Sequence, residues 1–410
     1  MDEPGSESGK RSDRRGAARG TRAGSWSPQE GGASSHLAAP LAPRSPGSFA
    51  AAAMGYPDNL LAASDGLPTA LLHAIRARLG DRARPGEPLA RYTSFRIGGP
   101  ADLLVLPDTA DELAHVLASA AACGTRVTLL GGGSNVLVGD GGMRGVVVKL
   151  GRGFARIDWE AEHESAQAAR GGSRAGVELG RAADAARESV RSARSARAPH
   201  GPPGEFIFIH AGAAVQLGRL ARAAVARGLA GLEYAEGIPG TVGGALFMNA
   251  GAYGGEVAHV VAAVEGLGRD GRAHALPGRE LVFGYRRSAL PPGFVVTAVR
   301  LRLRRDATAR ERMDEVRAQR TAAQPHGKAN AGSIFKNPKG DHAGRLIEIA
   351  GLKGARAGRA RISERHANFI VNEGGARAAD VKALMDVAQR VVWERSGVWL
   401  EPEVQLVGSW

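Results

Sequence analysis

Residues 231–256 read Gly-Leu-Glu-Tyr-Ala-Glu-Gly-Ile-Pro-Gly-Thr-Val-Gly-Gly-Ala-Leu-Phe-Met-Asn-Ala-Gly-Ala-Tyr-Gly-Gly-Glu. The glycine content rules out a single helix or ordinary strand throughout, yet the Ile, Val, Leu, Phe and Met residues indicate burial. Irregular buried backbone must satisfy its amide groups, and an anionic or strongly polar ligand that approaches closely would do so. The alternative is a flexible loop, which the apolar content disfavours. We therefore predict a buried ligand wall here.

The composition limits the class of protein. With 410 residues, 43% of them hydrophobic, the chain can form two or three domains with cores of their own. The formal charge of +13 is typical of nucleic-acid binders, but aromatic residues make up only 5% and no basic stripe is interleaved with them. Binding of anionic small molecules explains the charge equally well.

The compartment follows from what the chain lacks. Cys123 is the only cysteine, so an intrachain disulfide and a thiolate metal cluster are impossible. His366 has no second His or Cys at a suitable spacing, so we predict no metal. No apolar run approaches the roughly 20 residues of a membrane span, and residues 1–53 lack the apolar core of a signal peptide. We expect a cytoplasmic monomer that binds neither membrane nor nucleic acid.

Two segments are predicted to be disordered. Residues 1–55 consist of Gly, Ser, Ala, Arg and Pro with hardly any large apolar side chain, and Met54 is a possible true start. A similar composition over 160–204 indicates an inserted surface loop.

A β-α-β unit precedes the first candidate phosphate site. Thr109 and Glu112 form a T-x-x-E capping box for a helix over 110–122, between strands at 103–106 and 127–130. The second strand runs into Gly131-Gly-Gly-Ser-Asn135, whose amides can form a nest for phosphate oxygens while Ser134 and Asn135 add donors. The loop lacks the Rossmann and Walker patterns, and a plain turn remains the alternative.

The remaining elements follow from periodicity and turn signals. A helix is expected from Leu217, and an Asp-Gly hairpin turn is expected at 269–271. Further strands are predicted at 145–150, 257–268, 294–303, 362–372 and 398–407, and helices at 67–79, 304–320, 343–350 and 378–392. Order is expected to resume at 205–211 after the insert.

Several polar residues stand inside apolar or glycine-rich motifs, and each has an ordinary interpretation. Ser333 could cap a helix, Arg286 could be a surface cation, and Glu403 could be a solvated edge residue. The others are Tyr253, Tyr285, Lys336 and Asn337. No serine-hydrolase elbow, kinase set or metal cluster is present. A phosphate loop, a buried ligand wall and acid groups in a separate C-terminal segment remain.

Together these motifs resemble the UDP-N-acetylenolpyruvoylglucosamine reductase family of bacterial flavoenzymes, over about residues 90–407 without the insert. Seven motifs occur in the family's order: Tyr92-Thr-Ser-Phe-Arg-Ile-Gly-Gly-Pro-Ala-Asp, Gly131-Gly-Gly-Ser-Asn-Val-Leu, Gly237-Ile-Pro-Gly-Thr-Val-Gly-Gly, Asn249-Ala-Gly-Ala-Tyr-Gly, Phe283-Gly-Tyr-Arg, Ala331-Gly-Ser-Ile-Phe-Lys-Asn-Pro and Leu400-Glu-Pro-Glu-Val.

The resemblance implies an α+β protein with an FAD-binding fold of the vanillyl-alcohol oxidase and p-cresol methylhydroxylase type. Two flavin subdomains would cover 56–150 and 151–303, and a substrate-binding domain would cover 304–410. FAD contacts are carried over onto Gly131, Gly132, Gly133, Ser134, Asn135, Val136, Ile238, Pro239, Gly243, Gly244, Asn249 and Gly251.

The resemblance also implies the reaction. NADPH passes hydride to flavin N5, and the enolpyruvyl UDP-sugar then takes hydride at C3 and a proton at C2, giving UDP-N-acetylmuramate for peptidoglycan synthesis. Ser333 would donate the proton, Arg286 would stabilise the enolate-like carboxylate, and Glu403 would assist as an acid. Tyr253, Tyr285, Lys336 and Asn337 would hold the substrate.

Three features depart from the family or from its simplest interpretation. Ala323 stands where relatives often have lysine, which puts one substrate-phosphate contact in doubt. The 160–204 insert is untypical, and the short segment between Ser288 and Leu303 resembles the branch without a substrate-covering lid loop.

Another flavin-dependent oxidase or dehydrogenase of the same fold is the alternative enzyme, and a basic nucleic-acid-binding module is the alternative of a different class.

Overall fold

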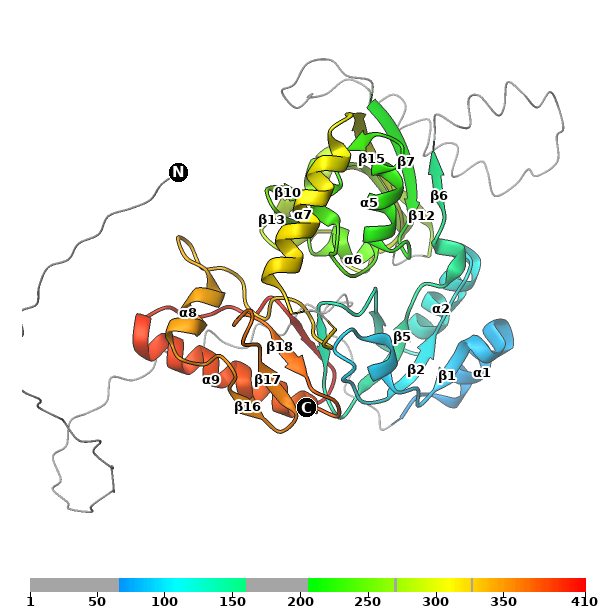
Figure 1. Cartoon of the computed structure of the whole chain (residues 1–410). Coiled ribbons are helices and arrows are strands. Elements are labelled where there is room, and N and C mark those ends of the chain that lie inside the picture. Colours follow the sequence, from blue (N-terminus) through cyan, green and yellow to red (C-terminus); the bar gives the residue numbers. More distant parts are fainter. Residues whose placement is uncertain (1–65, 160–205, 269–270, 326) are drawn as a thin grey trace, which may run out of the picture. The chain divides into compact units, whose positions relative to one another are not determined.

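A computed structural model describes residues 66–159, 206–268, 271–325 and 327–410 (Figure 1). The predicted tail at 1–55, Met54 and the 160–204 insert lie outside the described residues. Within the described residues, no helix combines the length and the apolar content that crossing a membrane requires.

The first sheet confirms the predicted β-α-β unit, and the strand predicted at 145–150 lies between the other two as β5. The strand order is β1-β2-β5-β3, and β5 runs parallel to both β2 and β3. Leu113, Val116 and Leu117 pack on the sheet in one apolar cluster. The elements are α1 (Thr69–Leu79), η1 (Gly80–Arg82), β1 (Ala83–Pro85), η2 (Leu89–Tyr92), β2 (Ala101–Val105), α2 (Ala110–Ala122), β3 (Val127–Leu129) and β5 (Met143–Val148).

The predicted capping box is half right. Thr109 Oγ1 accepts a hydrogen bond from the Glu112 amide at 3.2 Å, as a helix N-cap should. The Glu112 carboxylate instead accepts from the Asp108 amide at 2.8 Å and binds Arg82. The Arg82 hydrogen bond, partly opposed by burial, lowers the pKa of Glu112 to about 2.

The second sheet is antiparallel, in the order β12-β11-β15-β7-β6. Trp159 pairs with Ile209, so the chain leaves and re-enters this sheet on neighbouring strands around the segment 160–205. The β11–β12 pairing confirms the hairpin predicted around 269–271. The elements are η3 (Arg152–Phe154), β6 (Ile157–Trp159), β7 (Phe206–Gly212), α5 (Leu217–Val225), β8 (Leu229–Ala230), η5 (Val257–His259), β11 (Val261–Leu267), β12 (Ala273–Pro277), η6 (Gly278–Glu280), β13 (Val282–Gly284), β14 (Arg287–Ala289) and β15 (Val295–Arg305).

The glycine-rich stretch is buried over 232–236 and at several further apolar positions, whereas Gly237, Pro239, Tyr253 and Gly254 are exposed. It also contains regular elements that the glycine content concealed. They are η4 (Glu233–Ala235), α6 (Val242–Phe247), β9 (Gly251–Ala252) and β10 (Gly255–Glu256). Thr241 caps α6 by accepting from the Gly244 amide at 3.4 Å. Tyr253 and Gly254 join β9 to β10 with positive φ angles of 50° and 79°, as a two-residue hairpin turn with right-handed strand twist requires.

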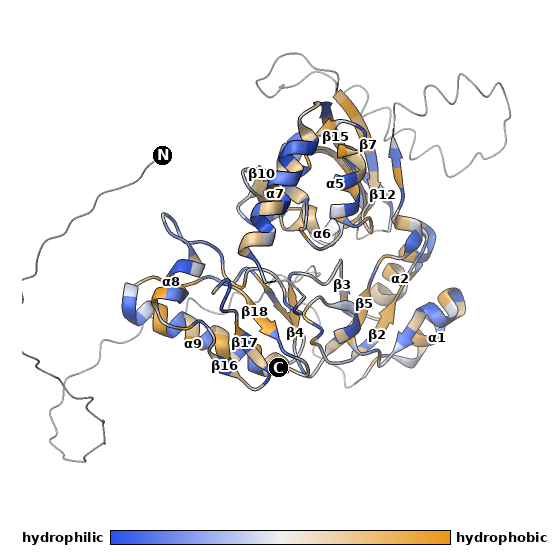
Figure 2. Cartoon of the chain, in the orientation of Figure 1, coloured by the Kyte–Doolittle hydropathy of each residue, from blue (hydrophilic) through white to orange (hydrophobic). Residues whose placement is uncertain are grey.

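The helix α7 (Ala309–Ala323) follows β15 and is hydrophilic along most of its length (Figure 2). Ala309 and Met313 are nevertheless buried in the apolar cluster of the second sheet. Arg312 donates from Nε to the buried Glu233 carboxylate at 3.0 Å, which ties α7 to the glycine-rich stretch. The helix predicted at 304–320 is confirmed, whereas the proposed domain boundary at 304 stays a prediction.

The C-terminal part corrects two strand predictions. The strand predicted over 362–372 is wrong, because its ends belong to β17 and β18, which pair antiparallel across a turn. The strand predicted over 398–407 is limited to β19, which pairs in parallel with β4 of the first segment. The elements are β4 (Val136–Val138), α8 (Ala343–Ile349), β16 (Arg356–Ala357), β17 (Ala360–Ile362), β18 (Ile370–Asn372), α9 (Ala378–Ser396) and β19 (Gln405–Val407).

Candidate functional site

Two adjoining cavities of about 580 and 710 Å³ lie where the glycine-rich stretch meets the 131–135 loop. They are called cavity A and cavity B below. Both are lined by Gly131, Thr241, Gly244, Arg286 and Gln405. Their volumes fall in the range of small-molecule and cofactor sites. Cavity A also receives Ser333 and Glu403 from the C-terminal part.

Glycines of the 131–135 loop pack directly against neighbouring backbone, with no room for a side chain. A Cβ on Gly132 would lie 2.5 Å from Gly240 Cα, and one on Gly133 would lie 1.9 Å from the Tyr92 carbonyl oxygen. Gly133 also has a φ angle of 64°, which disfavours any residue with a side chain. Only glycine allows the 131–135 loop to come this close to Gly240 on one side and to Tyr92 on the other. Successive glycine amides in such a loop can bind an anion at the cavity.

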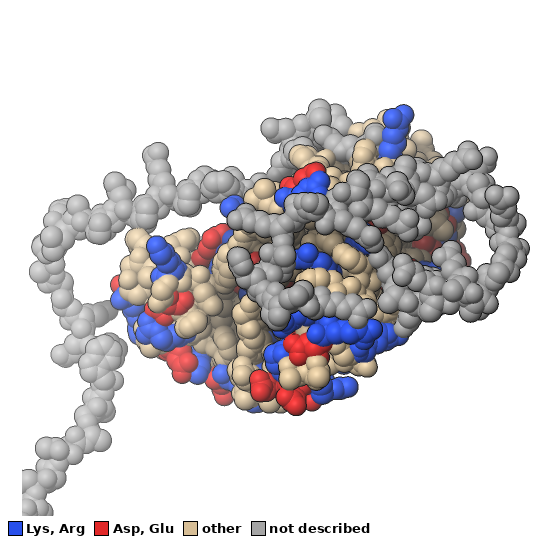
Figure 3. All heavy atoms as spheres, turned by 90° about the horizontal axis from the view of Figure 1, so that it is seen from above, with Lys and Arg blue, Asp and Glu red and all other residues tan. Residues whose placement is uncertain are grey.

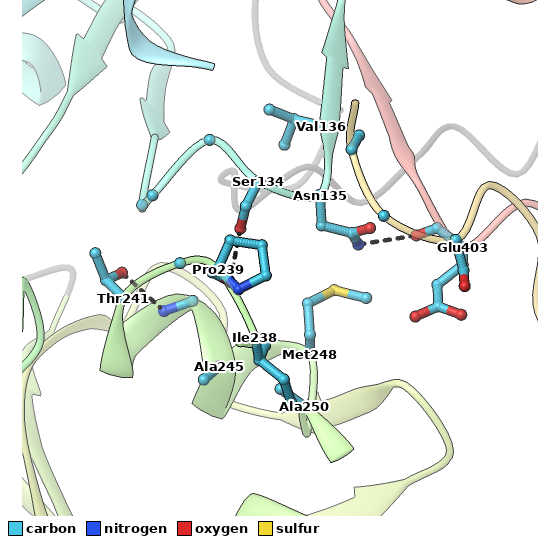
Figure 4. A pocket seen from close by; sticks show the side chains of 18 of the residues that line it. Ser134, Asn135, Val136, Ile238, Pro239, Thr241, Ala245, Met248, Ala250 and Glu403 are labelled. Atoms are coloured by element: carbon cyan, nitrogen blue, oxygen red, sulfur yellow. Dashed lines mark hydrogen bonds between the residues drawn. The ribbon is translucent and has the colours of Figure 1, made fainter. Parts of the chain in front are cut away.

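The 131–135 loop is held to both opposing walls (Figure 4). Ser134 Oγ donates to the Pro239 carbonyl at 3.0 Å, and Asn135 Nδ2 donates to the Glu403 carbonyl at 3.0 Å. The Gln405 amide donates to the Asn135 carbonyl at 2.9 Å. The loop that was predicted to bind phosphate therefore also fixes the position of Glu403.

Eleven of the twelve residues predicted to contact a cofactor line the cavities, and Asn249 does not. Gly243 lines cavity B and not cavity A. Asn249 is buried behind the wall, where its side chain donates to the Gly284 carbonyl at 3.1 Å and accepts from the Ala258 amide at 3.0 Å. The residues that line cavity A are Gly131, Gly132, Gly133, Ser134, Asn135, Val136, Ile238, Pro239, Gly244 and Gly251. Their roles stay predictions.

Arg286 and Glu403 form an ion pair that faces cavity A. Arg286 is the second turn residue between β13 and β14 and has a φ angle of 57°, a strained conformation for a residue with a side chain. Arg286 Nε donates to Glu403 Oε1 at 2.7 Å, and the two side chains are only 21% and 15% exposed. The Arg286 guanidinium also lies over the Tyr285 ring at 4.9 Å.

Burial and the neighbouring cations act on the Glu403 carboxyl in opposite directions. Burial raises the pKa of Glu403 above its usual value, while the charges of Arg286 and Lys336 act in the opposite direction. Because the burial effect is the larger one, Glu403 retains its proton to a higher pH than an exposed glutamate does. A buried carboxylic acid next to a cation is a suitable proton donor and anion partner.

Ser333 is brought to the same wall by the chain segment that contacts Glu403. The neighbouring Ile334 carbonyl accepts from the Glu403 amide at 2.8 Å. On the other side, the Gly332 amide donates to Asn330 Oδ1 at 2.9 Å, and Gly332 has a φ angle of 75°. Both neighbours of Ser333 are thus fixed, which holds its hydroxyl at cavity A.

Of the four predicted substrate residues, Lys336 alone lines one of the two cavities. Tyr253 and Tyr285 are 46% and 50% exposed, and neither lines cavity A or B. Lys336 lines cavity B and pairs with Glu401. Asn337 Oδ1 accepts from the Ala343 amide at 3.1 Å and so caps α8. Substrate contacts by these four residues stay predictions.

Sequence reasoning missed Arg320, which lines cavity A from the last turns of α7. The buried Glu236 carboxylate binds Arg222 and Arg317, at 3.1 and 3.2 Å. Among the described residues no ion pair joins Arg320 to a carboxylate, although the Glu236 charge partly offsets the burial that lowers its pKa. Arg320 Nη1 donates to Gln324 Oε1 at 3.3 Å, and its Nε is buried without a hydrogen bond. Its guanidinium lies 5.6 Å from the Tyr253 ring centre. The sequence offered one signal for Arg320. It precedes the unusual Ala323 by three residues, so on a helix the two lie side by side on the same face.

The surface charge and the candidate metal ligands bear on the alternative functions. On the face shown in Figure 3, the described Lys and Arg side chains are interspersed with Asp and Glu. That mixture gives no support to the nucleic-acid alternative. No group of three or more His, Cys, Asp or Glu residues suited to a metal ion occurs in the part of the chain that the structure describes.

Comparison with known protein families divides the chain into two matched parts. Residues 101–192 and 207–276 match the family described as FAD binding domain. Residues 324–407 match the family described as UDP-N-acetylenolpyruvoylglucosamine reductase, C-terminal domain. These matches confirm the predicted α+β flavin fold with a separate C-terminal domain.

Individual relatives match this chain over nearly the whole of their own length. The UDP-N-acetylenolpyruvoylglucosamine reductase of Rubrobacter xylanophilus is 43% identical over 336 residues, covering 81% of this chain and 97% of the relative. That of Myxococcus xanthus is 42% identical and covers 84% and 98%. The crystal structure of the enzyme from Thermus caldophilus is 37% identical, with a TM-score of 0.59 over 79% of this chain and 98% of that one.

Proposed function

We propose that this chain, which belongs to the UDP-N-acetylenolpyruvoylglucosamine reductase family, reduces the enolpyruvyl group of its UDP-sugar substrate to UDP-N-acetylmuramate at the expense of NADPH. The observation that carries the proposal is the convergence of Ser333, Arg286 and Glu403 on cavity A, which is also lined by glycines of the 131–135 loop and of the 237–244 stretch. The protein is an FAD-dependent oxidoreductase of peptidoglycan precursor synthesis, and we expect it to act in the cytoplasm as a monomer.

The residues around the cavities suit FAD. The amides of Gly132 to Asn135 would hold its diphosphate, and the backbone of 238–244 would lie against its ring system. FAD supplies the transfer of hydride that no side chain of the protein can perform. The crowding at Gly132 and Gly240 supports this use, because a Cβ on either residue would push the 131–135 loop away from the 238–244 backbone beside it.

The protein's own residues would handle the charge and the proton. Addition of hydride to C3 places negative charge on C2 and the adjoining carboxylate of the substrate. Arg286, whose side chain is only 21% exposed, would stabilise that charge. Ser333 would deliver a proton to C2, and Glu403 in its protonated form would support the same carboxylate by hydrogen bonding.

Arg320 supports a substrate-phosphate role for the α7 end of cavity A. A buried cation without an acidic partner is costly unless an anion joins it. Gly237 makes room for it, since a Cβ there would lie 2.6 Å from Arg320 Cδ. We propose that Arg320 provides the cationic contact that Ala323 cannot.

The proposed reaction is tested by two absorbance measurements without oxygen. Addition of NADPH should remove the visible flavin absorbance, and addition of UDP-N-acetyl-3-O-(1-carboxyvinyl)-glucosamine should restore it. Lactate and a hexose serve as control substrates, because other oxidases and dehydrogenases act on alcohols and sugars. Bleaching without recovery on the enolpyruvyl substrate would contradict the substrate assignment while leaving the flavin assignment standing.

Replacement of Arg320 by methionine should raise the KM for the UDP-sugar by roughly 10- to 100-fold with a smaller change in kcat, because a charged contact to phosphate is lost at constant side-chain length. Initial rates over a range of substrate concentrations provide the measurement. Arg310→Met is the matched control, since Arg310 is exposed on the same helix. An unchanged KM would show that Arg320 does not contact the substrate.

A further inference from the structure

Cavity B has a one-sided charge. Its described lining includes five basic side chains and no Asp or Glu, and these are Lys149, Arg152, Arg286, Arg287 and Lys336. Two of the five are neutralised, because Arg286 pairs with Glu403 and Lys336 pairs with Glu401. Arg152 and Arg287 are exposed and well hydrated. Cavity B is therefore suited to an anion. Of the three basic residues that form no ion pair among the described residues, Lys149 is the least exposed to solvent.

Lys149 is positioned by the first sheet. It directly follows β5, and β5 runs parallel to β3 with Val148 opposite Leu129. The Lys149 amide donates to the Val105 carbonyl at 2.9 Å, and the Val148 carbonyl accepts from the Leu130 amide at 2.8 Å. The carboxyl ends of both strands thus open together onto the 131–135 loop. In parallel sheets, this is the edge at which ligands bind.

The ammonium group points into that loop. Lys149 Nζ donates to the Gly131 carbonyl at 2.7 Å. Among the described residues it has no carboxylate within ion-pair distance. Burial lowers the pKa of the Lys149 ammonium, which shows that the surrounding protein does not compensate its charge. A partly buried lysine without an acid is stabilised when an anion occupies the space beside it.

We propose that Lys149 is a binding residue for the diphosphate of FAD, acting beside the amides of the 131–135 loop. The proposal rests on the FAD cofactor of the proposed function. Lys149 would contribute in two ways. Its hydrogen bond to the Gly131 carbonyl satisfies an oxygen that would otherwise face the diphosphate. Its positive charge neutralises part of the negative charge of the diphosphate, whereas the loop amides are neutral and contribute hydrogen bonds alone.

The test compares FAD with riboflavin, which carries the same ring system without phosphate. Flavin-free protein is titrated with each ligand, and binding is followed by fluorescence. For Lys149→Met, the Kd for FAD should rise by roughly 10- to 100-fold, while that for riboflavin should stay within about twofold. Lys149→Arg retains the charge and should keep most of the FAD affinity.

Two further variants separate charge from structure. Lys149→Gln retains a donor for the Gly131 carbonyl but no charge, and it should lose FAD affinity like the methionine variant. Lys382→Met should bind both ligands as the wild type does, since Lys382 contacts Asp386 at 2.6 Å on the exposed side of α9. These titrations use neither NADPH nor the UDP-sugar, so they remain decisive if the reductase assay fails. Unchanged FAD affinity, or equal weakening of FAD and riboflavin, would overturn the proposal.

Discussion

Replacement of Ser333 by alanine is expected to slow reduction of the enolpyruvyl substrate by roughly 10²- to 10⁴-fold, the usual contribution of a positioned general acid. NADPH should bleach the flavin at the wild-type rate, because no proton from Ser333 is needed for that step. The structure supports this separation, since both neighbours of Ser333 are fixed by backbone bonds and the substitution removes only the hydroxyl.

Single-turnover kinetics measure the two steps separately. Flavin bleaching by NADPH and flavin recovery on substrate addition are recorded by stopped flow for each variant. Ser333→Cys retains a transferable proton and should recover part of the rate. Ser396→Ala is the matched control, because its hydroxyl donates only to the Val392 carbonyl at the end of α9, at 2.7 Å. If Ser333→Ala slowed flavin bleaching as much as flavin recovery, the proton-donor role would be rejected in favour of general disruption.

Replacement of Glu403 by glutamine should reduce kcat by roughly 10²- to 10³-fold, the loss typical when a group that stabilises charge in an enclosed site is removed. Glutamine has nearly the same size, so it leaves the Asn135 and Ile334 contacts to the Glu403 backbone in place. What it removes is the acidic proton and the carboxylate next to Arg286.

The pH dependence of kcat tests whether the protonated form of Glu403 is the active one. Burial raises the pKa of Glu403, so the protonated form persists above the usual pKa of glutamate and disappears as the pH rises through the raised value. The wild-type kcat should therefore fall on the alkaline side, and the glutamine variant should lack this decrease. Glu394→Gln, an exposed substitution on α9, should retain the wild-type profile. An unchanged alkaline limb in Glu403→Gln would assign that limb to another group.

Elements with local causes could be predicted from the sequence. The helix α2 follows from Thr109 as its cap and from Leu113, Val116 and Leu117 on one face, and all of these signals lie within one short segment. The β9–β10 hairpin, by contrast, was hidden because three of the six residues 251–256 are glycines, which leaves no alternation of apolar and polar side chains to detect. The strand predicted over 362–372 failed because its apolar ends look continuous, while contacts with distant backbone turn the chain between β17 and β18.

The site shows the same division. The motifs named Ser333, Arg286 and Glu403 from a family resemblance, and the structure places all three at cavity A. The resemblance did not indicate Arg320 or Lys149. Each is an ordinary basic residue in its local sequence, and it becomes distinctive only because folding leaves it without an acidic partner at a cavity wall.

The sequence by itself determined where the chain can approach a ligand closely, because the absence of a Cβ at Gly132, Gly133 and Gly240 is a covalent property of those residues. It also determined the family and hence the chemistry. Only the tertiary structure decided which charges meet, since Arg286 and Glu403 lie 117 residues apart. The raised pKa of Glu403 and the unpaired state of Lys149 depend on burial, and burial exists only after distant segments have packed together.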